Sequence, residues 1–331
     1  MRYRRRVQVV GGSTYVVSLP KEWAKGTGLK HGSEVIIEVM PDLTLRVYSG
    51  DKGGERLELE TELEVGDDFE LSVATLIASY VVGYRKLIVT CRECLLDMLE
   101  ALIKRVTEIT IGLEVIEKGD RYVVLRCLAD VSTLSLTEAL NTLTKLTIKS
   151  LEDVENVVKT GNLDQVNEVL DRDSLIDKLY LYGLRQLNEV LLGMTNYTSV
   201  GLSSVAEVTY WAMILRSLER IADHVAVIAR NTKKLRPEDL VVILKYVALL
   251  RHKYDEVVKH ILLKPRIEDL SKFGALIREL RGIEAEISKD PATLSISGVE
   301  NLLRISAYLR DIIELLIDMH ALKELLAETA S

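Results

Sequence analysis

Apolar residues recur at helical spacing along the second half of the chain. From about residue 134 onward, Leu, Ile and Val return every three or four positions with polar residues between them, which is the pattern of amphipathic helices. Gly161, Pro237, Pro265 and Pro291 interrupt the pattern, and such residues end or separate helices. The apolar pattern with these interruptions predicts six long helices, over residues 133–161, 162–193, 200–235, 239–263, 267–289 and 296–328.

The first of these helices carries recognisable signals at both ends. Ser135 and Glu138 stand in capping-box order at its start, and Gly161 follows its last apolar residue. Gly183 lies inside the second helix, where it suggests a bend. Three long helices followed by three more favour an internal repeat of three-helix bundles, over residues 134–236 and 237–331.

The start of the chain has a different pattern, with short alternating segments and turn residues. Strands are expected over 4–10, 14–20, 33–40 and 43–49, and a short helix from Lys21 ends near Gly28. A further strand over 56–60 could join them. Residues 1–50 are therefore expected to form a small β-rich head.

Residues 51–133 combine both patterns. A helix is expected over 67–84, a strand over 85–91, a second helix over 91–109 and a hairpin over 113–128. Acidic residues open the first helix, where the helix dipole favours them. The order αβαββ predicts a small α/β segment that connects the head to the helical bundles. The whole chain is thus expected to be multidomain.

Charge is distributed unevenly along the chain. The chain carries a net charge of −7 and is 48% hydrophobic, which argues against disorder. The first fifty residues have eight basic and four acidic residues, so the remainder carries −11. A basic head on an acidic body points to a module that binds a polyanion such as DNA. The candidate DNA-binding residues are Arg2, Arg4, Arg5, Arg6, Lys21 and Lys25.

Several classes of protein are disfavoured. Apolar runs fall short of the roughly 18 residues of a membrane span, and no signal-peptide core follows the basic start. Three cysteines fit no disulfide framework, so a cytoplasmic protein is expected. Cys91 and Cys94 form a C-x-x-C pair, which we interpret as structural thiols, with Cys127 nearby, rather than a redox motif. No nucleophile elbow, phosphate loop or H-E-x-x-H motif is present, so no enzyme is predicted.

Two pairs of acids stand out on the second and third predicted helices. Asp173 and Asp177 are four residues apart, as are Glu219 and Asp223, so each pair shares one helix face. Facing carboxylates in a bundle repel one another unless a cation lies between them. His224 lies about 100° round the helix from Asp223, which makes it a doubtful ligand. The alternative is that the acids are solvated or paired with Arg216 or Arg220.

The motifs that carry these acids resemble the PhoU family of phosphate-uptake regulators. The stretches are Asp173-Ser174-Leu175-Ile176-Asp177 and Leu218-Glu219-Arg220-Ile221-Ala222-Asp223-His224. The resemblance covers roughly 134–331 and implies metal ions, often iron or zinc, on Asp173, Asp177, Glu219 and Asp223. Magnesium also stays open. When the motifs of the first bundle are aligned with the second bundle in the preferred way, only one acid, Glu284, is retained there. One metal site is therefore implied. An alternative alignment pairs Glu219 and Asp223 with Glu314 and Asp318, but it loses the match of the Arg-Ile residues between the two bundles.

The head resembles the AbrB, or SpoVT-like, swapped-hairpin DNA-binding domain. The stretch GGSTYVVSLPKEWAKGTGLKHGSEV carries the likeness. The resemblance implies that two chains interleave their hairpins, so a homodimer is expected. Archaeal proteins join such a head to a PhoU-like body, and the whole chain is similar to those.

Three functions remain open at this point. The first is a transcriptional regulator of phosphate uptake whose head binds DNA and whose body binds metal and protein partners. The second is an adaptor whose head only dimerises and whose body docks on a phosphate ABC transporter or a sensor kinase. The third is metal-dependent hydrolysis on the carboxylates, which needs an open coordination position and a pocket.

Overall fold

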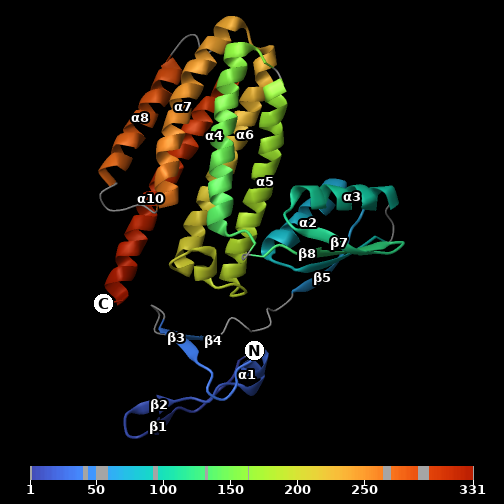
Figure 1. Ribbon diagram of the computed structural model, residues 1–331, viewed down its shortest axis with the longest axis vertical. Helices are drawn as coiled ribbons and strands as arrows, with labels where there is room; N and C mark the ends of the chain where they lie inside the picture. The colour runs from blue at the N-terminus through green and yellow to red at the C-terminus, as the bar shows by residue number, and fades with distance from the viewer. Residues whose placement is uncertain are drawn as a thin grey trace. The chain divides into compact units, whose positions relative to one another are not determined.

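The structure of the chain is a computed structural model, which describes residues 2–39, 44–49, 59–91, 96–130, 133–162, 164–263, 270–289 and 298–330. It divides into two compact units, Met1–Leu57 and Glu58–Ser331. The first unit is the head. The second contains the α/β segment and the helical body (Figure 1).

The head consists of two hairpins and a short helix. Strand β1 (Gln8–Val10) pairs antiparallel with β2 (Thr14–Val16) around the glycine turn. Helix α1 (Lys21–Gly26) follows Pro20, and β3 (Val35–Val39) pairs antiparallel with β4 (Leu45–Ser49). The strand expected over 4–10 begins only at Gln8 in the structure, so the arginines at positions 2, 4, 5 and 6 precede it.

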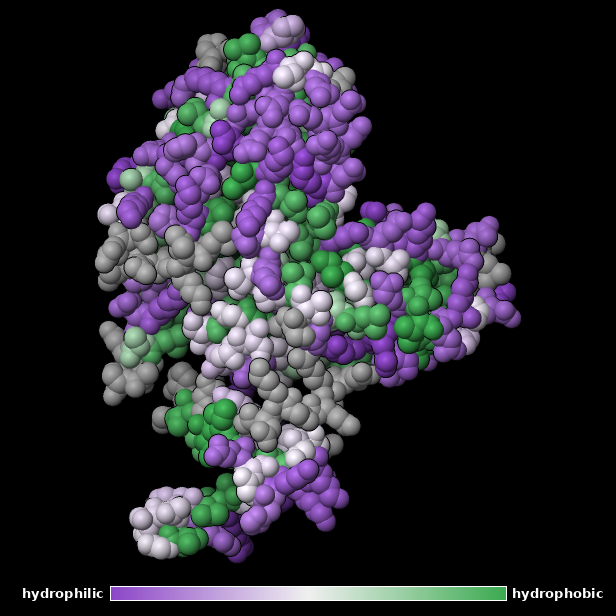
Figure 2. Space-filling model, viewed as in Figure 1, coloured by the Kyte–Doolittle hydropathy of each residue, from purple (hydrophilic) through white to green (hydrophobic). Residues whose placement is uncertain are grey.

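None of the head residues whose burial is described is buried within a single chain. The strands instead expose large apolar side chains, and Figure 2 shows apolar and hydrophilic patches side by side on this unit. These exposed residues are Tyr3, Val7, Val9, Val10, Tyr15, Val16, Val17, Leu19, Ile36, Ile37, Val39 and Leu45. A domain without a core of its own requires another surface to cover it.

The α/β segment has one strand more than its sequence pattern suggested. Strand β5 (Glu60–Glu64) pairs parallel with β6 (Lys86–Thr90), and the sheet order is β5-β6-β8-β7. The antiparallel partners β7 and β8 are Leu113–Lys118 and Tyr122–Cys127. The order is therefore βαβαββ. The strand expected over 56–60 lies mostly outside the described residues.

Two helices cover one face of this sheet. Helix α2 (Phe69–Val82) and α3 (Leu96–Ile109) pack on apolar side chains of the strands, among them Leu87, Val89 and Leu125. Asp68 caps α2 by accepting a hydrogen bond from the backbone N–H of Leu71. Both helices also contact α5 of the helical body, so the segment is docked on that body (Figure 1).

In the part of the body that the structure describes there are six long helices, as the sequence pattern predicted. They are α4 (Leu136–Thr160), α5 (Asp164–Leu191), α6 (Val208–Asn231), α7 (Pro237–Leu263), α8 (Leu270–Lys289) and α10 (Val299–Ala330). The Ser135–Glu138 capping box and the Gly161 end of α4 are confirmed. The third helix begins at Val208, not at 200, because the 3-10 turns η1 (Tyr197–Val200) and η2 (Val205–Glu207) precede it.

The two sets of three helices share a single hydrophobic core. Helix α10 packs along α6, and α7 packs along α4, so each set covers the other (Figure 1). The core runs without interruption from Leu143 on α4 through Ile221 on α6 to Ile305 on α10. Gly183 does not break α5. A Cβ at this position would lie 2.9 Å from Cδ1 of Leu215, so the glycine permits close packing of α5 against α6.

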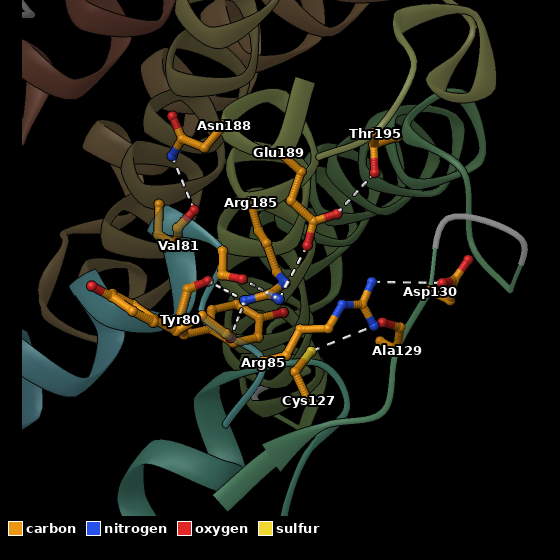
Figure 3. Close-up of polar contacts among 12 residues, drawn as sticks. Tyr80, Val81, Arg85, Cys127, Ala129, Asp130, Arg185, Asn188, Glu189 and Thr195 are labelled. Atoms are coloured by element: carbon orange, nitrogen blue, oxygen red, sulfur yellow. Dashed lines mark hydrogen bonds and ion pairs between the residues drawn. The ribbon is translucent and has the colours of Figure 1, made fainter. Parts of the chain in front are cut away.

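A buried arginine joins the body to the α/β segment (Figure 3). Arg185 on α5 donates hydrogen bonds to the carbonyls of Tyr80, Gly83 and Tyr84 at the C-terminal end of α2. It pairs with Glu189 at 3.1 Å, and its guanidinium lies 5.0 Å from the centre of the Tyr80 ring. The positive charge complements the negative end of the α2 dipole.

A glycine in the α/β segment allows a sensitive test of this fold. Gly112 has φ of +73°, and an added Cβ would lie 2.7 Å from the backbone nitrogen of Ala129. Gly112→Ala is expected to lower the free energy of unfolding by about 2–4 kcal/mol through left-handed strain and the backbone clash. Gly161→Ala is the control: it shares the left-handed φ but has open space, so a loss of about 1 kcal/mol is expected. Urea unfolding followed by circular dichroism measures both, and equal losses would contradict the clash.

Candidate metal centre and nucleic-acid interface

The structure brings three of the four predicted carboxylates together on facing helices. Asp177 lies on α5, and Glu219 and Asp223 lie on α6. One oxygen from each residue lies within 4.8 Å of the others. The grouping follows from the four-residue spacing, which places Glu219 and Asp223 on the same face of α6, and from the packing of α5 against α6.

The fourth predicted carboxylate, Asp173, lies one turn before Asp177 on α5. It is not part of the group within 4.8 Å, but it interacts electrostatically with Asp177 and Asp223. Its Oδ1 is buried and has no hydrogen-bond partner. Asp173 therefore lies outside the converging group but close enough to couple electrostatically with it.

Burial and mutual repulsion make the ionised cluster costly. Burial, together with the neighbouring Asp177 and Asp223, raises the pKa of Asp173 to about 7. Burial and the neighbouring Asp223 likewise raise the pKa of Glu219 to about 7, against the opposing effect of Arg220 and Arg216. The pKa of Asp177 is also raised, mainly by burial and then by Asp223, while Arg220 and Arg105 oppose the rise. Arg105, on α3, was not foreseen from the sequence.

Two arginines of α6 pair with the cluster, as the alternative interpretation expected. Nη1 of Arg220 donates to Oδ2 of Asp223 at 2.7 Å, and its Nε lies 3.3 Å from Oε2 of Glu219. The latter contact lacks hydrogen-bond geometry, so Oε2 is a buried oxygen without a hydrogen bond. Arg216 lies 3.6 Å from Oε1 of Glu219 and donates to the hydroxyl of Tyr180 at 3.2 Å. Ion pairing and a raised pKa thus coexist in this cluster.

His224 contacts a different helix. Its Nδ1 lies 2.8 Å from Oδ1 of Asn301, and its ring stacks on Tyr308, both on α10. The imidazole therefore contributes to the contact between α6 and α10.

No second carboxylate group of this kind occurs in the part of the chain that the structure describes. Glu284, the acid retained in the second set, accepts a hydrogen bond from Nε of Arg310 at 2.9 Å. Asp311 has a raised pKa from burial and from Glu314, but these residues do not converge as the first group does.

The carboxylate cluster has the chemistry of a hard-cation site. Carboxylate oxygens from two packed helices suit divalent and ferric ions. Glu219 is 7% exposed, and its buried Oε2, which lacks a hydrogen bond, is an unused ligand atom at the cluster. The residues present therefore fit a metal ion, and the same oxygens would take up protons in its absence.

The raised pKa values predict how the metal-free protein responds to pH. A carboxyl group whose pKa is higher in the folded state binds protons that the unfolded chain releases, so stability is greatest below the unfolded value of 4.5 and falls as pH rises through about 7. Glu219→Gln is expected to stabilise the chelator-treated protein at pH 8 by on the order of 1–3 kcal/mol and to reduce this slope. Denaturant melts at pH 5.5 and pH 8 measure the change. Glu324→Gln, at an exposed position, is the control, and an equal effect there would refute the argument.

The predicted DNA-binding residues are all exposed on the head. These are Arg2, Arg4, Arg5, Arg6, Lys21 and Lys25. The guanidinium of Arg5 lies 5.7 Å from the centre of the Tyr3 ring and donates to the carbonyl of Arg4. The two lysines lie on α1. Exposed cations on a small domain can contact phosphates without a cost of desolvating a buried charge.

The cysteines differ in part from expectation. Cys127 is free and buried, and burial raises the pKa of its thiol, which fits a structural role. Cys91 is disulfide-bonded, whereas reduced thiols had been expected. Cys94 lies outside the described residues. Across the described part of the chain, no helix combines the length and apolar character needed to cross a membrane.

Comparison with protein families finds two matches. Residues 140–232, which include all four predicted carboxylates, match the PhoU domain. Residues 8–61, which span the head and its two hairpins, match the family described as antidote-toxin recognition MazE, bacterial antitoxin. Comparison with curated proteins finds no match.

Proposed function

Since this chain is a PhoU-domain protein with an N-terminal head of the MazE/AbrB-like type, we propose that it is a cytoplasmic DNA-binding regulator of phosphate uptake. In this proposal the head forms a homodimer and binds DNA. The helical body binds a metal ion and protein partners. Both matched domain types are regulatory, and the absence of catalytic motifs in the sequence supports a role other than catalysis.

The observation that carries the proposal is the composition of the head surface. Apolar strand residues such as Val9, Tyr15 and Ile37 are 57%, 78% and 57% exposed in one chain. A second head can bury these residues, because interleaved hairpins bring strands of two chains together. The same dimer doubles the cluster formed by Arg4, Arg5 and Arg6, which gives a basic surface suited to DNA phosphates.

The carboxylate cluster supports the second half of the proposal. Asp177, Glu219 and Asp223 would hold a divalent or ferric ion, and Asp173, which couples electrostatically with this group, would be a further ligand. The ion would supply positive charge that neutralises the cluster. Because the ligands come from α5 and α6, their charge state affects how tightly these helices pack. The α/β segment lies on α5, so it is placed to respond to such a change.

A fluorescence anisotropy titration tests the function directly. Labelled mixed genomic fragments are titrated with the full chain at about 50 and 200 mM salt, a range over which six to ten phosphate contacts cost roughly 10³–10⁵ in affinity. Light scattering reports the oligomeric state in parallel. Steeply salt-dependent binding by a dimer is the expected result. A dimer that does not bind at the lower salt would refute DNA binding and favour an adaptor that docks on a phosphate transporter or a sensor kinase.

A further inference from the structure

Both carboxylate oxygens of Glu219 face a guanidinium from the same helix. Oε1 lies 3.6 Å from Nη1 of Arg216, and Oε2 lies 3.3 Å from Nε of Arg220. Arg220 also donates to Asp223 at 2.7 Å. Two of the three clustered carboxylates therefore already have a cation beside them, and that cation is part of the protein.

The position of Arg220 conflicts with that of a bound metal ion. Glu219 and Asp223 are two of the residues whose oxygens converge within 4.8 Å. Arg220 contacts Oε2 of Glu219 and Oδ2 of Asp223, so an ion held by the same two carboxylates would lie close to the guanidinium and repel it. Arg220 has room to leave, because its side chain is 35% exposed and extends to the surface of α6.

Arg216 differs from Arg220 in the strength of its contact with the cluster. It makes only the longer contact with Glu219, and it is held elsewhere by the hydroxyl of Tyr180 and by the Tyr180 ring, 5.5 Å away. It carries the same charge one turn earlier on α6. Arg216 is therefore a natural reference for the effect of charge alone.

We propose that Arg220 is a built-in counter-ion that competes with the metal ion for Glu219 and Asp223 and thereby sets the affinity of the site. The inference rests on the proposed metal site. In the metal-free protein Arg220 neutralises part of the buried charge and holds α6 in place. Metal binding displaces the guanidinium to solvent, so the ion binds only above a concentration that Arg220 determines.

A second role for the same contacts predicts the opposite result. A guanidinium bonded to an oxygen that does not coordinate the ion would orient the carboxylate and support binding. Removing such an outer partner typically weakens metal binding about 10–100-fold. The sign of the change in affinity therefore separates a competitor from a supporting residue.

Calorimetric titration with Mn²⁺ and with Zn²⁺ tests the proposal on the full chain. The protein is first treated with chelator, and the titration is run at pH 8, above the raised pKa values of about 7. Arg220→Gln is expected to tighten binding at least about tenfold. Arg216→Gln is expected to tighten it less. Unchanged or weaker binding by folded Arg220→Gln protein would overturn the proposal.

Asp177→Asn separates this inference from the metal site itself. It removes a ligand that Arg220 does not contact through any described hydrogen bond or ion pair, and it is expected to weaken Mn²⁺ binding in both the parent and the Arg220→Gln protein. If Mn²⁺ binds the parent and the Asp177→Asn protein with equal affinity, the proposed metal site is wrong, and the proposed role of Arg220 is then wrong as well. If Asp177→Asn weakens binding while Arg220→Gln does not tighten it, the site stands and only the competition is refuted.

Discussion

Replacing Arg4, Arg5 and Arg6 together by glutamine is expected to weaken DNA binding by at least about 10³-fold at 50 mM salt. The three residues are exposed in one chain, and a dimer carries six of them. Each phosphate contact contributes to affinity through counterion release, and each also adds to the salt dependence. The slope of log Kd against log salt should therefore fall in magnitude along with the affinity. Anisotropy titrations over a salt series measure both quantities.

A control of equal charge isolates the contribution of the head. Arg278, Arg281 and Lys289 are exposed on α8, and their replacement by glutamine removes the same charge from the body. This variant should bind DNA as the parent chain does. A similar loss in both variants would show a general effect of net charge. An unchanged affinity in the head variant would contradict the proposed interface.

Replacing Arg185 by methionine is expected to lower the free energy of unfolding by about 3–5 kcal/mol, because it leaves a buried charge without its partner. Glu189 is 4% exposed and would lose its ion pair, and three carbonyls at the end of α2 would lose their donor. For the unit Glu58–Ser331 the change corresponds to a fall in Tm of roughly 5–9 °C. Differential scanning calorimetry measures it.

Two further variants show whether the buried charge is the cause. Arg216→Met removes an arginine whose side chain is 49% exposed, and a loss of under about 1 kcal/mol is expected. The double variant Arg185→Met with Glu189→Gln should recover part of the loss, because it removes the uncompensated carboxylate. If the Arg185→Met variant is as stable as the Arg216→Met variant, the contacts of Arg185 contribute little to the docking of the α/β segment on the body.

The helices and the carboxylate cluster could be predicted because both depend on local spacing. Ser135, Glu138 and Gly161 mark the ends of α4 through contacts within a few residues, and the structure confirms them. The grouping of Glu219 and Asp223 follows from one helical turn. Pairing α5 with α6 needed only the expectation that successive helices in a bundle are neighbours.

The features that the sequence pattern missed depend on contacts distant in the chain. Strand β5 alternates Glu60, Glu62 and Glu64 with Thr61 and Leu63, a weakly apolar pattern whose parallel partner lies beyond a whole helix. Arg185 binds carbonyls at the C-terminal end of α2 and just beyond it, about a hundred residues earlier in the chain. A charged residue among the buried positions of α5 was the available signal, but spacing alone could not indicate its partners.

The continuous core has a consequence for how the helical body unfolds. Ile221 on α6 and Ile305 on α10 belong to one cluster, so neither set of helices can lose its packing while the other keeps its own. The body should melt in one cooperative transition, and residues 140–232 expressed by themselves should not fold stably, although they match the PhoU domain. A ligand bound between α5 and α6 would then make global unfolding of the whole body less frequent. Amide protons of α8 that exchange only through global unfolding would therefore exchange more slowly when the ligand is bound.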